Sequence, residues 1–81
     1  MELKDTVDLM TSSDYKNRFK AEYYQVKIRV EKLDKLLQDF YGSKLDFTPT
    51  SSIDLLQAQL TDMKNYMHKL EYRAEAEGIE L

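Results

Sequence analysis

Basic and aromatic side chains are interleaved between residues 15 and 35, where seven lysines and arginines accompany only three acidic residues. An ammonium or guanidinium group neutralises a phosphate, and an aromatic ring stacks on a nucleobase. This combination predicts a site for a small phosphorylated ligand. Charge alone makes Arg18, Lys27 and Arg29 candidate ligand-binding residues.

The same stretch has a simpler interpretation as a solvated helix whose cations pair with an acidic partner helix. The whole chain carries a net charge of −3. An acidic protein is a poor partner for long DNA or RNA, whose binding domains are usually basic. A ligand that needs only one or two local cations is more compatible with this charge balance.

The sequence offers no set of residues for catalysis. His68 is the only histidine, and cysteine is absent. No serine, cysteine or carboxylate spacing suggests a nucleophilic triad, and two isolated glycines cannot form a phosphate-binding loop. We therefore expect a protein that is not an enzyme and has no metal or cofactor, with His68 an ordinary exposed side chain.

Two runs of apolar residues at alternating spacings of three and four predict two long helices. We expect these helices at about 14–42 and 52–77. Ser13 is the expected cap of the first helix, and Ser51 or Ser52 that of the second. Gly42, in the left-handed conformation, and Gly78 are the expected ends. The seam residues are Phe19, Tyr23, Val26, Val30, Leu33, Leu37 and Phe40, and then Ile53, Leu56, Leu60, Met63, Met67, Leu70 and Ala74.

The predicted fold class is all-α: an antiparallel two-helix hairpin over residues 13–81, preceded by a short helical segment over residues 1–12. In that segment the spacing of Leu3, Val7 and Met10 predicts two helical turns. We expect Leu45 and Phe47, in the connection between the long helices, to fold back onto the end of the hairpin.

A chain of 81 residues without disulfides is marginal as a lone monomer, so we expect a homo-oligomer. Tyr24, Ile28, Leu55 and Tyr66 lie off the seams and need cover, either from residues 1–12 or from another subunit. No apolar run approaches the roughly 20 residues that span a bilayer, and the acidic N-terminus lacks a signal-peptide core. We therefore expect no membrane partner.

Three stretches resemble a family of small phage and prophage proteins related to a crAss-like phage gene product. They are Asp14–Gln25, Leu45–Pro49 and Arg73–Leu81. That family is similar in turn to the hairpin domain of phage anti-CBASS and anti-Thoeris sponges, through Phe19–Glu22, Glu31–Leu33 and Asp54–Leu55.

The resemblance implies a helical sponge, often a hexamer, in the cytoplasm of an infected bacterium. Such sponges bind cyclic di- or trinucleotides, or cyclic ADP-ribose-type signals, at subunit junctions without cleaving them. Lys20 stands in the place of a phosphate-contacting lysine, and Lys64 falls near a basic residue of the trinucleotide pocket. The expected aromatic near Asp5 is missing, so Tyr15 is the candidate stacking residue. The heptads predict the alternative, a coiled-coil hairpin adaptor that binds another protein, equally well.

Overall fold

The structure, a computed structural model, describes residues 1–81 and contains helices but no strands, which confirms the all-α prediction. A single 3₁₀ turn, η1 (Leu3–Thr6), leads into the short helix α1 (Val7–Met10). Two long helices follow, α2 (Tyr15–Tyr41) and α3 (Ile53–Glu77). Both long helices agree with the predicted ranges to within one residue.

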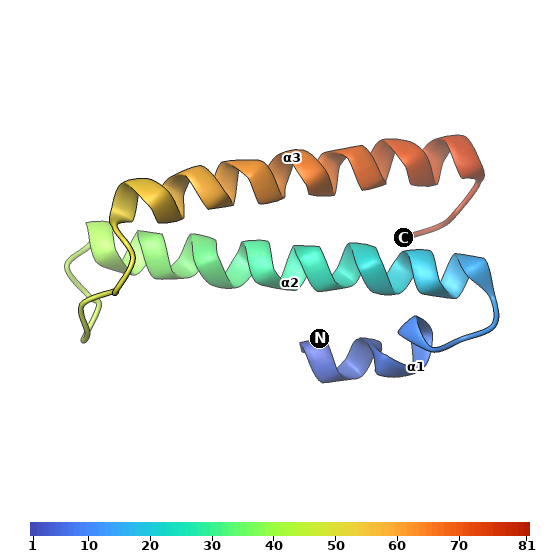
Figure 1. The fold of residues 1–81 in the computed structure, drawn as a ribbon, viewed down its shortest axis with the longest axis horizontal. Helices are drawn as coiled ribbons and strands as arrows, with labels where there is room; N and C mark the ends of the chain where they lie inside the picture. Colours follow the sequence, from blue (N-terminus) through green and yellow to red (C-terminus); the bar gives the residue numbers. More distant parts are fainter.

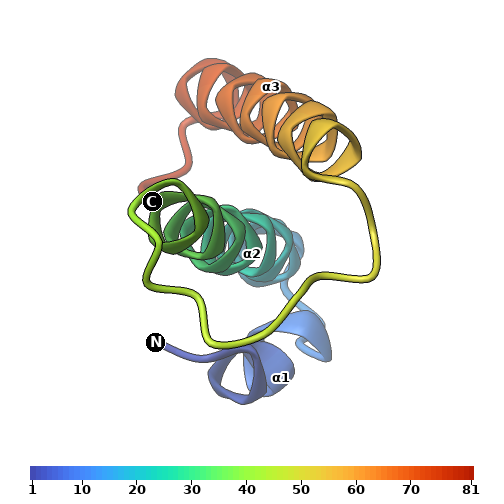
Figure 2. The same ribbon diagram turned by 90° about the vertical axis from the view of Figure 1, so that its left-hand side faces the viewer.

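The two long helices lie side by side, and α2 separates α3 from the N-terminal segment, residues 1–12 (Figures 1 and 2). Hydrogen bonds from the start of α2 reach the end of α3, because Tyr15 contacts Glu77 and Tyr23 contacts Glu71. The chain therefore runs in opposite directions along the two helices. This arrangement gives α2 two covered sides and leaves two long flanks of the helix open.

The predicted seams form the core between α2 and α3. One cluster gathers Phe19 and Tyr23 of α2 against Leu70 and Ala74 of α3, and a second joins Val30 and Leu37 to Leu60. The seam weakens towards the connection, where Phe40 is exposed. Ile79 completes the first cluster from beyond the end of α3.

The helix ends follow the sequence in part. Ser52 caps α3 by accepting a hydrogen bond from the Leu55 amide, and Gly78 ends α3 in the left-handed conformation with φ 69°. The expected cap at Ser13 is wrong, because Asp14 accepts the bond from the Lys16 amide at 3.0 Å.

The left-handed conformation expected at Gly42 is also wrong. Gly42 has φ −86°, and the next residue, Ser43, takes φ 58°. The turn is closed by the amides of Ser43 and Lys44, which bond to the carbonyls of Phe40 and Asp39. The chain therefore reverses one residue later than the glycine suggests.

The expectation for the connection between α2 and α3 is met only in part. Leu45 is half-buried, whereas Phe47 remains 55% exposed. Together with Phe40 and Pro49 they border a hollow of about 410 Å³ at this end of the molecule.

The N-terminal segment forms the expected helical turns and lies against α2 (Figure 1). Of the residues whose spacing predicted these turns, Val7 is 46% and Met10 47% exposed. Thr6 is instead fully buried. A 3₁₀ turn aligns residues three apart, which brings Thr6 in line with Leu3. The segment packs over the face of α2 that carries Ile28, which is buried, so that residue needs no second subunit as cover.

Candidate functional site

The predicted cations of α2 lie on two different flanks of the helix. At about 100° per residue, Lys16, Lys20 and Lys27 fall within about 40° of one another, between the side facing α3 and the side facing the N-terminal segment. We call these three residues the lysine flank. Lys20 is half-buried, and it lies about 10 Å along the axis from Lys27. None of the three forms an ion pair.

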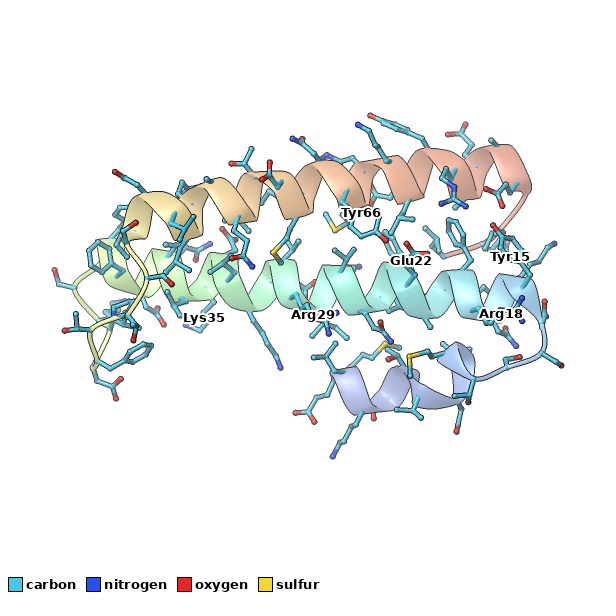
Figure 3. All side chains as sticks on the ribbon, viewed as in Figure 1. Tyr15, Arg18, Glu22, Arg29, Lys35 and Tyr66 are labelled. Atoms are coloured by element: carbon cyan, nitrogen blue, oxygen red, sulfur yellow. The ribbon has the colours of Figure 1, made fainter.

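Arg18 and Arg29 project from the opposite flank of α2, on the side that faces the viewer in Figure 3. The Arg18 guanidinium donates to the Ser12 carbonyl at 2.9 Å and so ties the end of the N-terminal segment to α2. The Tyr66 hydroxyl hydrogen-bonds the Glu22 carboxylate across the gap between α2 and α3 on this side (Figure 3). Arg18 and Arg29 therefore cannot share a small ligand with Lys20 and Lys27 in one subunit.

Tyr15, the predicted stacking residue, lies at the start of α2, where its hydroxyl is already hydrogen-bonded to side chains of α3. Its hydroxyl donates to Glu77 at 2.7 Å and accepts from Arg73 at 3.2 Å. The hydrogen bond to Glu77 raises the pKa of Tyr15, and the same bond lowers the pKa of Glu77. The Arg73 guanidinium also lies 5.1 Å from the centre of the Phe19 ring, a cation–π contact. The structure thus uses Tyr15 to join α2 to α3, away from the lysine flank.

Lys64, the predicted basic residue of α3, faces a carboxylate. Its Nζ atom lies 3.9 Å from Oδ1 of Asp34, and both side chains are partly exposed. Asp34 follows Lys27 by two helical turns and so lies on the lysine flank. The structure therefore brings Lys64 to the edge of this flank, where Asp34 offsets its charge.

The lysine flank leads into a pair of adjoining hollows around Ile28, which we call the Ile28 hollow. One part, of about 220 Å³, is bordered by Tyr24 and Lys27, and the other, of about 290 Å³, by Lys32 and Lys35. Met1, Ile28 and Glu31 border both parts. Met1 of the N-terminal segment, which lies alongside α2, forms one wall of the hollow (Figure 1).

The Ile28 hollow combines an apolar floor with a charged rim. Ile28 is buried, and the half-buried Tyr24 ring packs edge-on against Tyr23 with the ring centres 5.6 Å apart. Three lysines and one glutamate form the rim. Such a surface can hold a flat ring against the floor while the lysines attract a phosphate.

Of the residues predicted to bind a ligand, only Lys27 borders this hollow. On the sequence alone, Tyr24 and Ile28 are apolar residues in need of cover, and Lys32 and Lys35 only contribute to the charge balance. Their spacing contained the missing signal, because steps of three and one place all of them on one helical face. That face comprises Tyr24, Lys27, Ile28, Glu31, Lys32 and Lys35.

His68 is exposed, as expected. No three histidine, cysteine, aspartate or glutamate side chains come together in a group that could hold a metal ion. None of the helices is both long enough and apolar enough to cross a membrane.

These features define an all-helical protein with an open cationic surface that leads into a small, partly apolar hollow. The sequence profile of the Sequestin family matches residues 13–76. Since this range covers α2, the connection and nearly all of α3, the chain belongs to the Sequestin family, whose name points to sequestration. This membership is consistent with the expected relation to sponge-type proteins. Neither a curated protein nor a solved structure matches the chain.

Proposed function

We propose that this protein is a phage anti-defence sponge, which binds a cyclic di- or trinucleotide or a cyclic ADP-ribose-type signal and releases it unchanged. The observation that carries this proposal is membership of the Sequestin family over residues 13–76. The unpaired lysines of the lysine flank support it, because they suit an anionic ligand. The proposal includes a relation of this protein to the crAss-like-phage-related proteins and to the sponge hairpin domain.

We further propose that the antiparallel hairpin of α2 and α3 is the unit of a homo-oligomer, with six subunits as the expected number. In this assembly the ligand lies at subunit junctions, and the protein acts in the cytoplasm of the infected host without enzymatic activity. Several identical sites in one particle suit sequestration, since each particle removes several signal molecules. Competition with an effector requires a nanomolar Kd, equivalent to about −12 kcal/mol.

A retention experiment tests the sponge directly. The purified protein is incubated with a pool of cyclic di- and trinucleotides and cyclic ADP-ribose isomers, and free ligand is then removed by filtration. The protein is heat-denatured, and mass spectrometry identifies what is released. We expect one intact species, near one or one half equivalent per chain. A cleaved product, or no retained molecule beside a stable fold, would contradict the proposal.

Lys20→Glu tests the place of the ligand on the lysine flank. Replacing a phosphate-binding cation with an anion removes a charge-assisted hydrogen bond, so we expect retention to weaken by about a hundredfold while the oligomer persists. Lys69→Glu is the matched control, because Lys69 is exposed on the side of α3 remote from α2. Equal retention by both variants would place the ligand elsewhere.

The second candidate function is a coiled-coil hairpin adaptor that binds another protein. The exposed apolar side chains of α3 favour it, since Leu55 is 60% and Tyr72 71% exposed. An adaptor retains no nucleotide from the pool, and its absorbance ratio at 260 and 280 nm is that of protein alone. The retention experiment therefore separates the two functions.

A further inference from the structure

The Ile28 hollow holds lysines whose charges are not used elsewhere in the fold. Neither Lys27 nor Lys32 forms an ion pair or a side-chain hydrogen bond, whereas Lys35 pairs with Asp39 at 3.2 Å. Five residues separate Lys27 from Lys32, so they stand about 140° apart around the helix axis, on opposite sides of Ile28. Lys35, three residues beyond Lys32, borders the same part of the hollow as Lys32. The hollow therefore has a local positive charge on an acidic protein.

The floor of the hollow selects for a ring rather than for a bare anion. The buried Ile28 side chain and the half-buried Tyr24 ring present carbon atoms to the hollow, and Met1 adds a third apolar wall. A free phosphate gains nothing from these surfaces, whereas a nucleobase buries its face against them. The two parts, of about 290 and 220 Å³, together approach the size of pockets that hold small molecules.

We propose that the Ile28 hollow binds a phosphorylated purine, with the phosphate on Lys32 and the ring on Ile28 and Tyr24. The inference rests on the function proposed above and deepens it, because it assigns one nucleotide unit of the sequestered signal to a defined surface. Lys35 contributes at the rim, where Asp39 already shares its charge.

Glu31 sets the preferred base. It borders both parts of the hollow and makes no hydrogen bond or ion pair of its own. A carboxylate only accepts hydrogen bonds, so it pairs with base edges that present N–H donors. Guanine offers two adjacent donors, N1–H and the N2 amino group, which match the two oxygens of one carboxylate. The hollow therefore favours guanine over adenine.

The three isoleucines make a direct test possible. Ile28 is in the hollow, Ile53 begins α3 and Ile79 lies beyond its end, so a methyl-labelled sample gives one reporter at each place. Guanosine 5′-monophosphate is titrated into the full chain while the methyl spectrum is recorded. We expect the Ile28 signal to move with a saturating dependence while the signals of Ile53 and Ile79 stay in place. Adenosine 5′-monophosphate should require at least a fivefold higher concentration.

Matched charge reversals decide whether Lys32 holds the phosphate. Lys32→Glu should raise the half-saturating concentration at least tenfold, whereas Lys44→Glu, in the connection, should leave it unchanged. Glu31→Gln should remove the preference for guanine. The Ile53 and Ile79 signals report that each variant is folded.

A stationary Ile28 signal, equal movement of all three signals, or equal affinity of the two lysine variants would each overturn the hollow as a site. The outcome is independent of the retention experiment. Retention of a cyclic signal together with a silent Ile28 leaves the sponge intact and removes this assignment. An Ile28 response without retention of any cyclic signal keeps the hollow and removes the sponge.

Discussion

Three tyrosine–glutamate hydrogen bonds join α2 to α3, and the middle one is the most buried. The Tyr23 hydroxyl donates to Glu71 at 2.6 Å. Along α3, Glu71 lies between Tyr66, which bonds to Glu22, and Glu77, which bonds to Tyr15. Burial, followed by the hydrogen bond to Glu71, raises the pKa of Tyr23 to about 12 from an ordinary value of 10.0. A neutral tyrosine at this position is therefore part of the stability of the fold.

Tyr23→Phe tests that contribution. The variant loses a hydrogen bond to a charged acceptor, so we expect its free energy of unfolding at neutral pH to fall by about 2 kcal/mol. Below pH 10 Tyr23 is protonated in both states, and its contribution is complete. Between about pH 10 and 12 the unfolded chain loses this proton first, so the stability that neutral Tyr23 gives declines as the pH rises.

Denaturant unfolding followed by circular dichroism across this pH range measures the effect. The wild-type protein should lose stability more steeply with pH than the Tyr23→Phe variant. Tyr72→Phe is the matched control, because Tyr72 is exposed and forms no side-chain hydrogen bond. Identical alkaline slopes for wild type and Tyr23→Phe would show that the hydrogen bond to Glu71 is not formed in solution.

At the scale of the elements, the start of α2 allows two neighbouring residues to be compared as helix caps. The Asp14 carboxylate caps the helix, whereas Ser13 makes no side-chain hydrogen bond. Asp14→Ala should lower the free energy of unfolding by about 1 kcal/mol, and Ser13→Ala should leave it nearly unchanged. Thermal unfolding of the two variants side by side measures the difference. A larger loss of unfolding free energy for Ser13→Ala than for Asp14→Ala would show that Ser13 caps the helix, as the sequence predicts.

Local patterns account for most of what the sequence predicted about the elements. The alternating spacing of apolar residues located both long helices to within one residue, because successive turns of a helix place their buried side chains on the same side. It could not separate Ser13 from Asp14, since both residue types cap helices well and only the path of the preceding chain selects one. The path includes Ser12, whose hydroxyl accepts from the Asp14 amide and from Asn17.

These local patterns do not predict contacts between residues that are far apart in the sequence. Thr6 is buried because its hydroxyl donates to the Leu3 carbonyl and accepts from Gln25, which is 19 residues away. Ile79 is buried because the left-handed Gly78 turns the chain back onto Phe19. The sequence did not predict the Ile28 hollow for the same reason, since the hollow forms between Met1 of the docked N-terminal segment and α2.

At the scale of the whole molecule, one chain exposes more surface than its mass requires. The accessible surface is 5783 Å², and only 12 of the 81 residues are buried. A compact monomer of this mass exposes about 5,100 Å². The shape explains the difference, because the chain extends over 43 × 24 × 17 Å and its long helices are covered on few sides. The excess is close to the roughly 800 Å² that each partner contributes to a standard interface.

This excess predicts that the isolated chain associates. The exposed Leu55 and Tyr72 of α3, together with the open hollow beside Phe47, offer apolar surface that the N-terminal segment does not cover. Light scattering on a size-exclusion column should therefore give a mass that is a multiple of one chain, with six as the proposed number. The melting temperature should fall on dilution, because dissociation removes the stability that assembly adds. A constant monomer mass and a concentration-independent melting temperature would contradict assembly and would confine any ligand to the surface of a single chain.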